Sequence, residues 1–400
     1  MNFEEIVFLD KEYILPFYSR FNIGFRRGKG CYLYGYDGKK YLDFTSAIGV
    51  MNFGHSNKFI LKALRKQSSK LMTTSNLFHS EERVKLAKLL VDISFDGGVF
   101  FSNSGAEANE AAIKIARFFG KTIHKDKYII LSLKGSFHGR TLATITATGQ
   151  AKYQKNLEPL PSGFEYVEYN DCDDLESKFN DRVCAIFLEA IQGEGGVRPL
   201  SYEFVRKVEQ LAKKYNALIV FDEVQTGIGR TGKYFGYQHY DIQPSIITLS
   251  KALGGGLPIG ATILGREYFN VCEVGMHAST MGGNQLSTAV ALATLKLLTD
   301  TNILSRVEYH SSILFSELKE LQKSFTFIRE VRGKGLMIGV DIDESVKVMD
   351  IINKLIEECI LTLRSGENTL RLLPPLVITE KEINLFIKAF KKVLSKIKMN

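Results

Sequence analysis

Short apolar runs alternate with longer segments of helical periodicity through the middle of the chain, and this alternation constrains the fold more than any other feature. The runs are Val99–Phe101, Tyr128–Leu131, Ala185–Leu188, Ala217–Phe221, Ile246–Ile247 and Ala261–Leu264. A strand that is apolar on both sides must be covered on both faces, as in a parallel sheet flanked by helices. The pattern therefore predicts an α/β fold with a mostly parallel central sheet.

The two ends of the chain differ from its middle. Residues 28–45 predict a hairpin with its turn at Asp37-Gly38, and residues from about 300 onward mix amphipathic helices with short strands. A chain of 400 residues that is 45% hydrophobic can form two or three domains. We predict an N-terminal segment over residues 1–50 that joins a small domain, a large domain over 51–290, and the rest of the small α+β domain over 291–400.

Composition narrows the class of protein. The net charge is +8, and its densest part lies between Lys388 and Lys398, where helical apolar spacing predicts a solvated helix face rather than a nucleic-acid surface. Five scattered cysteines without a Cys-x-x-Cys pair argue against a disulfide framework or a metal cluster. No apolar run approaches a membrane span, and the first residues lack a signal-peptide pattern. We expect a cytoplasmic protein with no metal site.

Two residues with useful chemistry follow neighbouring apolar runs. Asp222 comes directly after Ala217–Phe221, and Lys251 lies between Ile246–Ile247 and a glycine-rich turn. Open α/β sheets bind ligands at the carboxyl ends of their strands. The pair predicts pyridoxal phosphate chemistry, in which the lysine forms a Schiff base and the acid keeps the pyridine nitrogen protonated. A lone lysine in such a place is more often a solvated loop residue.

Two further segments fit such a cofactor. Ser104 and Glu107 have capping-box spacing before an alanine-rich helix, and Gly105 lets an anion approach free N–H groups, although a capped helix without a ligand is the alternative. Phe137 could stack on a planar ring, and Arg140 could hold a carboxylate. We interpret the intervening histidine as an orienting or packing residue rather than a base.

A glycine-rich segment over residues 227–233 imitates a nucleotide site. It satisfies Gly-x-Gly-x-x-Gly and nearly satisfies a phosphate-binding P-loop. However, Tyr234 occupies the position where a P-loop has Ser or Thr, and Asp222–Thr226 separates the glycines from the preceding strand. We therefore do not predict nucleotide binding.

Several long motifs together resemble the class III aminotransferases. They are Ser102–Ala108, Phe137–Thr141, Ile191–Val197, Phe221–Gly232, Lys251–Gly260 and Leu370–Leu376. The resemblance runs from about Tyr13 to the C-terminus. It implies the fold-type I architecture, pyridoxal 5′-phosphate as cofactor, and a homodimer whose active sites lie at the subunit interface.

The resemblance also implies residue roles. Lys251 is similar to the Schiff-base lysine, Asp222 to the partner of the pyridine nitrogen, and Phe137 to the residue that stacks on the ring. The other residues that it places at the cofactor are Glu223, Val224, Gln225 at the phenolic oxygen, and Gly105 and Ala106 at the phosphate, with Thr280 from the other subunit. It places Arg140 and Ser279 at the substrate. Ala190, Ala278 and Met281 depart from the family pattern.

The activity that the resemblance implies is transfer of the terminal amino group of N-acetylornithine to 2-oxoglutarate, in arginine biosynthesis. The alternatives are another ω-transaminase, acting on succinyl-diaminopimelate, ornithine or 4-aminobutyrate, an aminomutase, and a non-catalytic relative.

One site must then accept two unlike substrates, because glutamate has a second carboxylate beside its reacting carbon. We expect Arg371 to bind this carboxylate and Glu194 to pair with Arg371 when an ω-amino donor is bound. A fixed structural ion pair between the two is the alternative.

Overall fold

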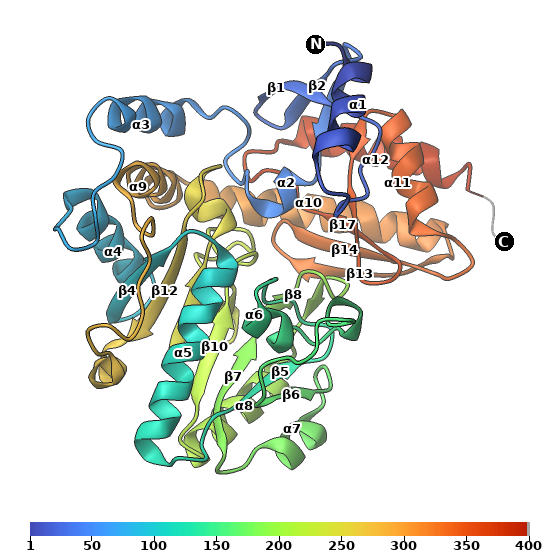
Figure 1. Ribbon diagram of the computed structural model, residues 1–400. Coiled ribbons are helices and arrows are strands. Elements are labelled where there is room, and N and C mark those ends of the chain that lie inside the picture. The colour runs from blue at the N-terminus through green and yellow to red at the C-terminus, as the bar shows by residue number, and fades with distance from the viewer. Residues whose placement is uncertain (398–400) are drawn as a thin grey trace.

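The six apolar runs form strands of one seven-stranded sheet in the computed structural model, which describes residues 1–397 (Figure 1). In spatial order the strands are β4 (Gly97–Ser102), β12 (Gly260–Gly265), β11 (Ile246–Leu249), β10 (Leu218–Asp222), β7 (Val183–Leu188), β5 (Ile129–Leu133) and β6 (Phe164–Val167). All neighbours are parallel except that β12 is antiparallel to both β11 and β4. The predicted mostly parallel sheet is confirmed, and β6 is an edge strand that the sequence did not reveal.

Helices cover both faces of this sheet. Along β5, Ile130 packs with Ala112 and Ile113 of α5 (Gly105–Ile123), whereas its neighbour Leu131 belongs to the core that includes Val208 of α8 (Tyr202–Lys214). Successive strand side chains point to opposite faces, so the two helices lie on opposite sides. This double cover explains why the strands are apolar at nearly every position.

Shorter elements complete the central part of the chain. The helices are α3 (Lys58–Ser68), α4 (Glu81–Ile93), α6 (Leu142–Ala147), α7 (Cys172–Lys178) and α9 (Gln285–Thr299), and a small hairpin pairs β8 (Ile191–Gln192) with β9 (Arg198–Pro199). Single 3-10 turns occur at Ala151–Tyr153, Gly236–His239, Lys251–Gly254 and Arg266–Val271.

The two ends of the chain share a second region. The predicted hairpin is present as β2 (Tyr32–Gly35) and β3 (Lys40–Asp43), with β1 (Phe25–Lys29) beside β2 and the C-terminal β15 (Ile360–Leu361) parallel to β3. A separate antiparallel sheet has the order β13 (Ile328–Lys334), β14 (Met337–Ile342), β17 (Thr369–Leu372) and β16 (Leu363–Ser365). The remaining helices are α1 (Phe3–Tyr13), α2 (Ser46–Gly49), α10 (Ile303–Ser324), α11 (Val348–Glu357) and α12 (Glu380–Leu394). In Figure 1 the blue N-terminal elements lie beside the red C-terminal ones.

Two predictions about the ends can be compared with these elements. On α12 the lysines Lys388, Lys391 and Lys392 are exposed while Phe386 and Phe390 are buried, so the predicted solvated lysine face is confirmed for this helix. Lys398 lies outside the described residues. The division of the chain at residues 50 and 290 stays a prediction, and residue 290 lies within α9. Across residues 1–397, none of the helices combines the length and apolarity needed to cross a membrane.

The sheet topology decides where a ligand can bind. Because β12 is antiparallel to both of its neighbours, β4 has the same direction as β11, β10, β7 and β5. The segments that follow these strands therefore meet at one edge of the sheet. All the strand-end residues selected from the sequence belong to these segments.

Candidate active site

Lys251 follows β11 at the start of a 3-10 turn, and its backbone is strained. Its φ angle is 41°, in the left-handed region that residues other than glycine rarely adopt. Such a conformation costs on the order of 1 kcal/mol and persists only where the surrounding structure imposes it, commonly at functional sites. The side chain enters a cavity of about 260 Å³. Burial lowers the pKa of Lys251, although the nearby Glu194 carboxylate opposes this change.

Asp222 ends β10 and lines the same cavity with only 5% of its surface exposed. Its Oδ2 accepts a hydrogen bond from Asn109 Nδ2 at 2.8 Å and pairs with His138 Nδ1 at 2.9 Å. Its Oδ1 accepts a hydrogen bond from Val224 N at 3.0 Å. Thr248 Oγ1 donates to Asn109 Oδ1 at 2.7 Å, which fixes the orientation of that amide. The carboxylate is therefore held rigidly at the cavity wall.

His138 has the orienting position that its sequence context suggested. Its ring is buried, and Nε2 has no hydrogen-bond partner within residues 1–397. Burial disfavours the charged imidazole, but the hydrogen bond and charge of Asp222 outweigh this and raise the pKa of His138. The imidazole acts on the cavity through Asp222 rather than by facing solvent.

Two residues of the cavity were missed at the sequence level. Asn109 lies on the buried face of α5, and Glu189 follows β7 just as Asp222 ends β10. Glu189 accepts hydrogen bonds from Phe137 N at 3.0 Å and Gly193 N at 3.3 Å, and burial raises its pKa to about 7. A rule that selects acids at the ends of apolar runs could have found Glu189. Asn109 offers no comparable signal.

The start of α5 presents unused N–H groups to the cavity. Ser104 Oγ accepts a hydrogen bond from Glu107 N at 3.1 Å, but the Glu107 side chain turns to the preceding loop, so only half of the predicted capping box forms. Neither Gly105 N nor Ala106 N has an acceptor in the described part of the chain. A Cβ on Gly105 would lie 2.9 Å from both γ-carbons of Val224. Glycine at this position therefore lets Val224 pack against the start of α5, where the unused N–H groups and the positive helix end suit a phosphate.

An aromatic residue and a cation also line this cavity. Phe137 and Arg140 both line it, and the ring of Tyr153 meets Phe137 edge-on with centroids 5.8 Å apart. The Arg140 guanidinium lies 4.1 Å from the centroid of the Tyr153 ring. It makes no ion pair with any residue between 1 and 397, which leaves its charge available to a substrate carboxylate.

Arg371, on β17, meets Glu194 at the rim of the cavity. Arg371 is 3% exposed, and its Nη1 donates to Glu194 Oε1 at 2.5 Å and to Gly193 O at 2.8 Å. Burial opposes ionisation of Glu194, but the Arg371 guanidinium lowers the pKa of this carboxyl below its ordinary value. Glu194 lines the cavity that Lys251 enters, and Arg371 contacts this lining residue.

The segment Asp222–Gln225, at the end of β10, divides between two environments. Asp222, Val224 and Gln225 line the cavity, and Gln225 Oε1 is buried with no partner in the described residues. Glu223 does not line it. Its carboxylate instead accepts hydrogen bonds from Gly236 N at 2.8 Å and Tyr237 N at 2.7 Å, and burial raises its pKa to about 7.

Ser279 and Thr280 lie apart from Lys251. They line a different hollow, of about 470 Å³, together with Thr73–Leu77. Ser279 Oγ accepts hydrogen bonds from Gly282 N at 2.9 Å and Asn103 Nδ2 at 3.2 Å, and Thr280 is exposed. Within one chain the structure therefore does not bring Thr280 to the cofactor cavity.

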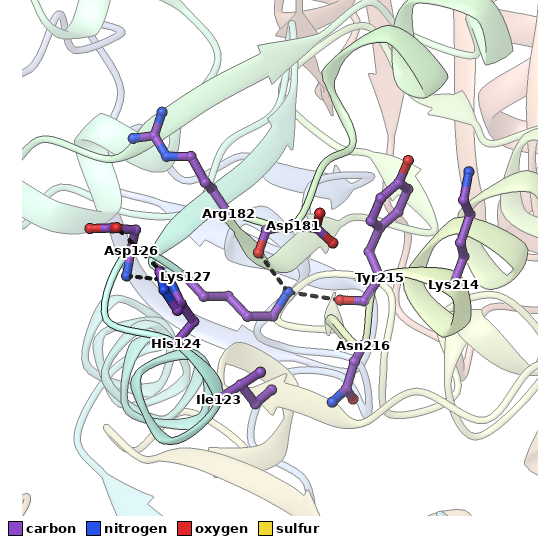
Figure 2. A pocket seen from close by; sticks show the side chains of 9 residues that line it. All are labelled: Ile123, His124, Asp126, Lys127, Asp181, Arg182, Lys214, Tyr215 and Asn216. Atoms are coloured by element: carbon purple, nitrogen blue, oxygen red, sulfur yellow. Dashed lines mark hydrogen bonds and ion pairs between the residues drawn. The ribbon is translucent and has the colours of Figure 1, made fainter.

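A larger hollow, of about 650 Å³, lies at the opposite edge of the same sheet (Figure 2). Its lining precedes strands β5, β7 and β10, and it contains a buried lysine, Lys127, which is 2% exposed. Lys127 Nζ donates to the carbonyls of Asp181 at 3.2 Å, Val183 at 2.7 Å and Tyr215 at 2.7 Å. All three of its protons are used, so this lysine has a structural role.

The chain matches the family model described as "Aminotransferase class-III" over residues 16–394. The chain belongs to the class III aminotransferases. It is 43% identical over 390 residues to an acetylornithine aminotransferase of Caldanaerobacter subterraneus, with 97% of this chain and 99% of the relative covered. An acetylornithine/succinyldiaminopimelate aminotransferase of Buchnera aphidicola is 41% identical over 386 residues, covering 96% of this chain and 95% of the relative.

A solved structure agrees with this membership. The ornithine aminotransferase of Toxoplasma gondii, described with partial occupancy of PLP at its active site, has a TM-score of 0.95 and 30% identity, covering 98% of this chain and 94% of that one. The predicted fold and the class III resemblance are therefore confirmed.

The family's cofactor, pyridoxal phosphate, fits the residues of the small cavity. The unused N–H groups of Gly105 and Ala106 suit its phosphate, and the rigidly held Asp222 suits its ring nitrogen. Lys251 lines the same cavity, and its Nζ makes no hydrogen bond or ion pair with any residue of the range 1–397, so it could form the Schiff base with the aldehyde.

Proposed function

We propose that this class III aminotransferase transfers the terminal amino group of N2-acetyl-L-ornithine to 2-oxoglutarate, giving N-acetyl-L-glutamate 5-semialdehyde and L-glutamate. Relatives named for acetylornithine, 41–43% identical over nearly their whole length, support this substrate. The observation that carries the proposal is the Arg371–Glu194 pair at the rim of the Lys251 cavity. It offers a means for one site to accept both substrates.

The residues around the cavity divide the chemistry among them. When bound, pyridoxal phosphate supplies an electron sink for the carbanion that forms at the substrate carbon. Asp222 holds the proton on the ring nitrogen, and its three hydrogen bonds keep it in place. Lys251, with a pKa lowered by burial, takes the proton from the substrate carbon as a base and returns it as an acid.

Each substrate presents a different pattern of charge. N-acetylornithine reacts at its terminal carbon and has one distant carboxylate, whereas glutamate has carboxylates both distant from and next to its reacting carbon. Arg140, free of ion pairs among residues 1–397, binds the distant carboxylate of both. Arg371 binds the near carboxylate of glutamate. When N-acetylornithine is bound, Glu194 neutralises Arg371, because a buried cation without a partner is unfavourable.

Separate half-reactions test this exchange. Glu194→Ala is expected to slow the N-acetylornithine half-reaction about tenfold or more while largely sparing the glutamate half-reaction, and Arg371→Ala is expected to do the reverse. Single-turnover spectra of the bound cofactor measure each half. Equal losses in both halves would identify a fixed structural ion pair and exclude the exchange.

A second amino donor is supported by the names of some relatives. One group of relatives is named for both acetylornithine and succinyl-diaminopimelate, and both compounds present a terminal amine on an acylated diamino acid. Measuring kcat/KM for N-acetylornithine, succinyl-diaminopimelate, ornithine and 4-aminobutyrate, each with 2-oxoglutarate, would rank these four donors. Turnover without a keto acid would instead indicate an aminomutase.

We also propose a cytoplasmic homodimer in which Thr280 and Ser279 of one subunit complete the partner's cavity. Thr280 is exposed and outside its own cavity, and large apolar side chains around it, Met72, Leu77, Phe78 and Met281, are 49–89% exposed. Such a patch is typical of a protein interface.

Mixing two variants tests the shared site. Lys251→Ala and Thr280→Asp are each expected to be inactive, the second because its carboxylate repels the cofactor phosphate. After subunit exchange, half of the dimers are mixed and each has one intact site, so about a quarter of wild-type activity should return. No recovery despite demonstrated exchange would place Thr280 in its own subunit's site or outside both.

A further inference from the structure

The glycine-rich segment over residues 227–233 contains an arginine with an unusual environment. Arg230 is 0% exposed, and it has no carboxylate within hydrogen-bond distance in the described chain. Its Nη1 donates to Leu336 O at 2.9 Å and Pro374 O at 2.6 Å, and its Nη2 donates to Asn52 Oδ1 at 2.5 Å. Burial lowers the pKa of Arg230 to about 9, so the guanidinium stays charged at neutral pH.

The three acceptors come from distant parts of the chain. Asn52 follows α2, Leu336 lies between β13 and β14, and Pro374 follows β17. The glycines allow these segments to approach closely. A Cβ on Gly229 would lie 2.7 Å from Leu298 Cδ1 and 3.1 Å from Leu376 Cδ1. Outside the pattern, a Cβ on Gly335 would lie 2.4 Å from the carbonyl carbon of Thr231, and Leu336 N donates to Arg230 O at 3.0 Å. The nucleotide-like glycine pattern thus serves chain packing around Arg230.

One of the three acceptors belongs to the segment that carries Arg371. Leu373 N donates to Phe44 O at 2.7 Å, and Leu376 N donates to Asn52 O at 2.7 Å. Pro374, between them, has no N–H to donate, and its carbonyl is held by Arg230. Leu373, Pro374 and Leu376 are therefore each held by a hydrogen bond, and Arg371 lies just upstream on β17.

A guanidinium suits this task better than other side chains. Its planar fork directs several donors along fixed lines, whereas a lysine ammonium is a flexible point charge and a methionine donates nothing. Small displacements matter here, because a misplacement of about 1 Å in a positioning group can reduce a reaction about a hundredfold.

We propose that Arg230 is a positioning residue for Arg371. By holding the Pro374 carbonyl against Asn52 and Leu336, it sets the reach of the Arg371 guanidinium toward the carboxylate next to the reacting carbon. Arg230 thereby determines how well the site accepts glutamate and 2-oxoglutarate. This inference rests on the proposed function of Arg371.

The primary test compares Arg230→Lys with Lys127→Met, a variant that removes a structural lysine at the far edge of the sheet. Arg230→Lys is expected to raise KM for glutamate and 2-oxoglutarate about tenfold or more while changing KM for N-acetylornithine less than about threefold. Lys127→Met is expected to leave both KM values, and so their ratio, unchanged, although both variants lose stability. Equal effects on the two substrates, or the same pattern in Lys127→Met, would overturn the proposal.

Hydrogen–deuterium exchange gives a second readout on the protein before cofactor is added. Amides of residues 370–378 should exchange faster in Arg230→Lys than in wild type, and unchanged protection would also overturn the proposal. If Arg230→Lys does not fold, Asn52→Ala removes one of the three acceptors and should shift the KM ratio in the same direction by a smaller factor. An unchanged ratio in Asn52→Ala would then count against the proposal.

Arg371→Ala distinguishes a failure of the proposed role of Arg371 from a failure of the proposed role of Arg230. If Arg371→Ala does not impair the glutamate half-reaction selectively, the proposed role of Arg371 fails. If it does so and Arg230→Lys does not, only the positioning role of Arg230 fails.

Discussion

The central sheet has a lysine at each of its two edges, Lys127 buried and Lys251 partly buried, and their surroundings are opposite. Lys127, at the edge that precedes the strands, donates all three protons to backbone carbonyls, of which those of Asp181 and Tyr215 are drawn in Figure 2. Lys251, at the edge that follows the strands, donates to no residue within 1–397 and has a strained backbone. Burial lowers the pKa of both lysines. The lowered pKa therefore does not distinguish a catalytic lysine, whereas an unused ammonium group does.

The comparison shows that unfavourable interactions are concentrated around Lys251. Next to Lys251 are Glu189, with a pKa raised to about 7, the partnerless Nε2 of His138 and the unpaired Oε1 of Gln225. Lys127 has every donor satisfied. Strain and unsatisfied groups gather where a ligand will satisfy them. Four predictions test this contrast, from the largest effect to the smallest.

Of these substitutions, Lys251→Ala should have the largest effect on activity. The substitution removes the amine that moves the proton, so turnover should fall by at least about 10⁴-fold. The fold should be retained, because the side chain makes no hydrogen bond with residues 1–397. Steady-state rates and circular dichroism measure the two properties. Near-normal transamination by this variant would show that the catalytic lysine lies elsewhere.

Asp222→Asn keeps the side-chain volume but removes the charge that stabilises a protonated ring nitrogen. We expect a loss of roughly 3 kcal/mol of transition-state stabilisation, or about a hundredfold in rate, in both half-reactions. Stopped-flow spectra of each half measure it. Unchanged rates would leave Asp222 as a structural acceptor for Asn109, His138 and Val224.

Lys127→Met should affect stability instead of catalysis. Three carbonyls lose their donor, and we expect the free energy of unfolding to fall by about 3 kcal/mol, with partial compensation by water entering the hollow. Urea unfolding measures the change, and kcat at 25 °C should stay within about twofold of wild type. The exposed Lys125→Met is the matched control and should lie within about 0.5 kcal/mol of wild type. A selective loss of activity in Lys127→Met would give this edge a functional role.

Glu189→Gln tests whether the buried carboxylate of Glu189 destabilises the folded protein. In the folded chain the pKa of Glu189 is raised from 4.5 to about 7, so the folded state binds a proton in this window that the unfolded state releases. The free energy of unfolding therefore falls as pH rises from about 4.5 to about 7, by about 3 kcal/mol for this group.

Removing the carboxyl should remove that pH dependence. At pH 8 the cofactor-free Glu189→Gln variant should be more stable than wild type, and the difference should vanish below about pH 4.5. Urea unfolding at several pH values measures it. Equal stability of the two proteins at pH 8 would show that Glu189 is not strained.

The sequence predicted most of the fold for one physical reason. A strand covered on both faces is apolar at nearly every position, so the strands β4, β5, β7, β10, β11 and β12 were visible as runs. The edge strand β6, Phe164–Val167, is half-buried and was missed because it lacks that signal. The glycine-rich segment over 227–233 shows the converse: its pattern imitated a phosphate loop, and only the structure revealed that it surrounds Arg230.

By itself, the sequence determined which side chains follow the strands, because direction along a parallel sheet is encoded in chain order. Lys251, Asp222, Gly105 and Phe137 could therefore be assigned to one edge before any coordinates were known. Only the tertiary structure decided which groups lack partners. Asn109 reaches Asp222 and Arg230 reaches Pro374 across 113 and 144 residues of chain. The pairing of Arg371 with Glu194 was expected only because of the resemblance to the family. Hydrogen bonds depend on three-dimensional distance, and local sequence patterns contain no information about contacts at such separations.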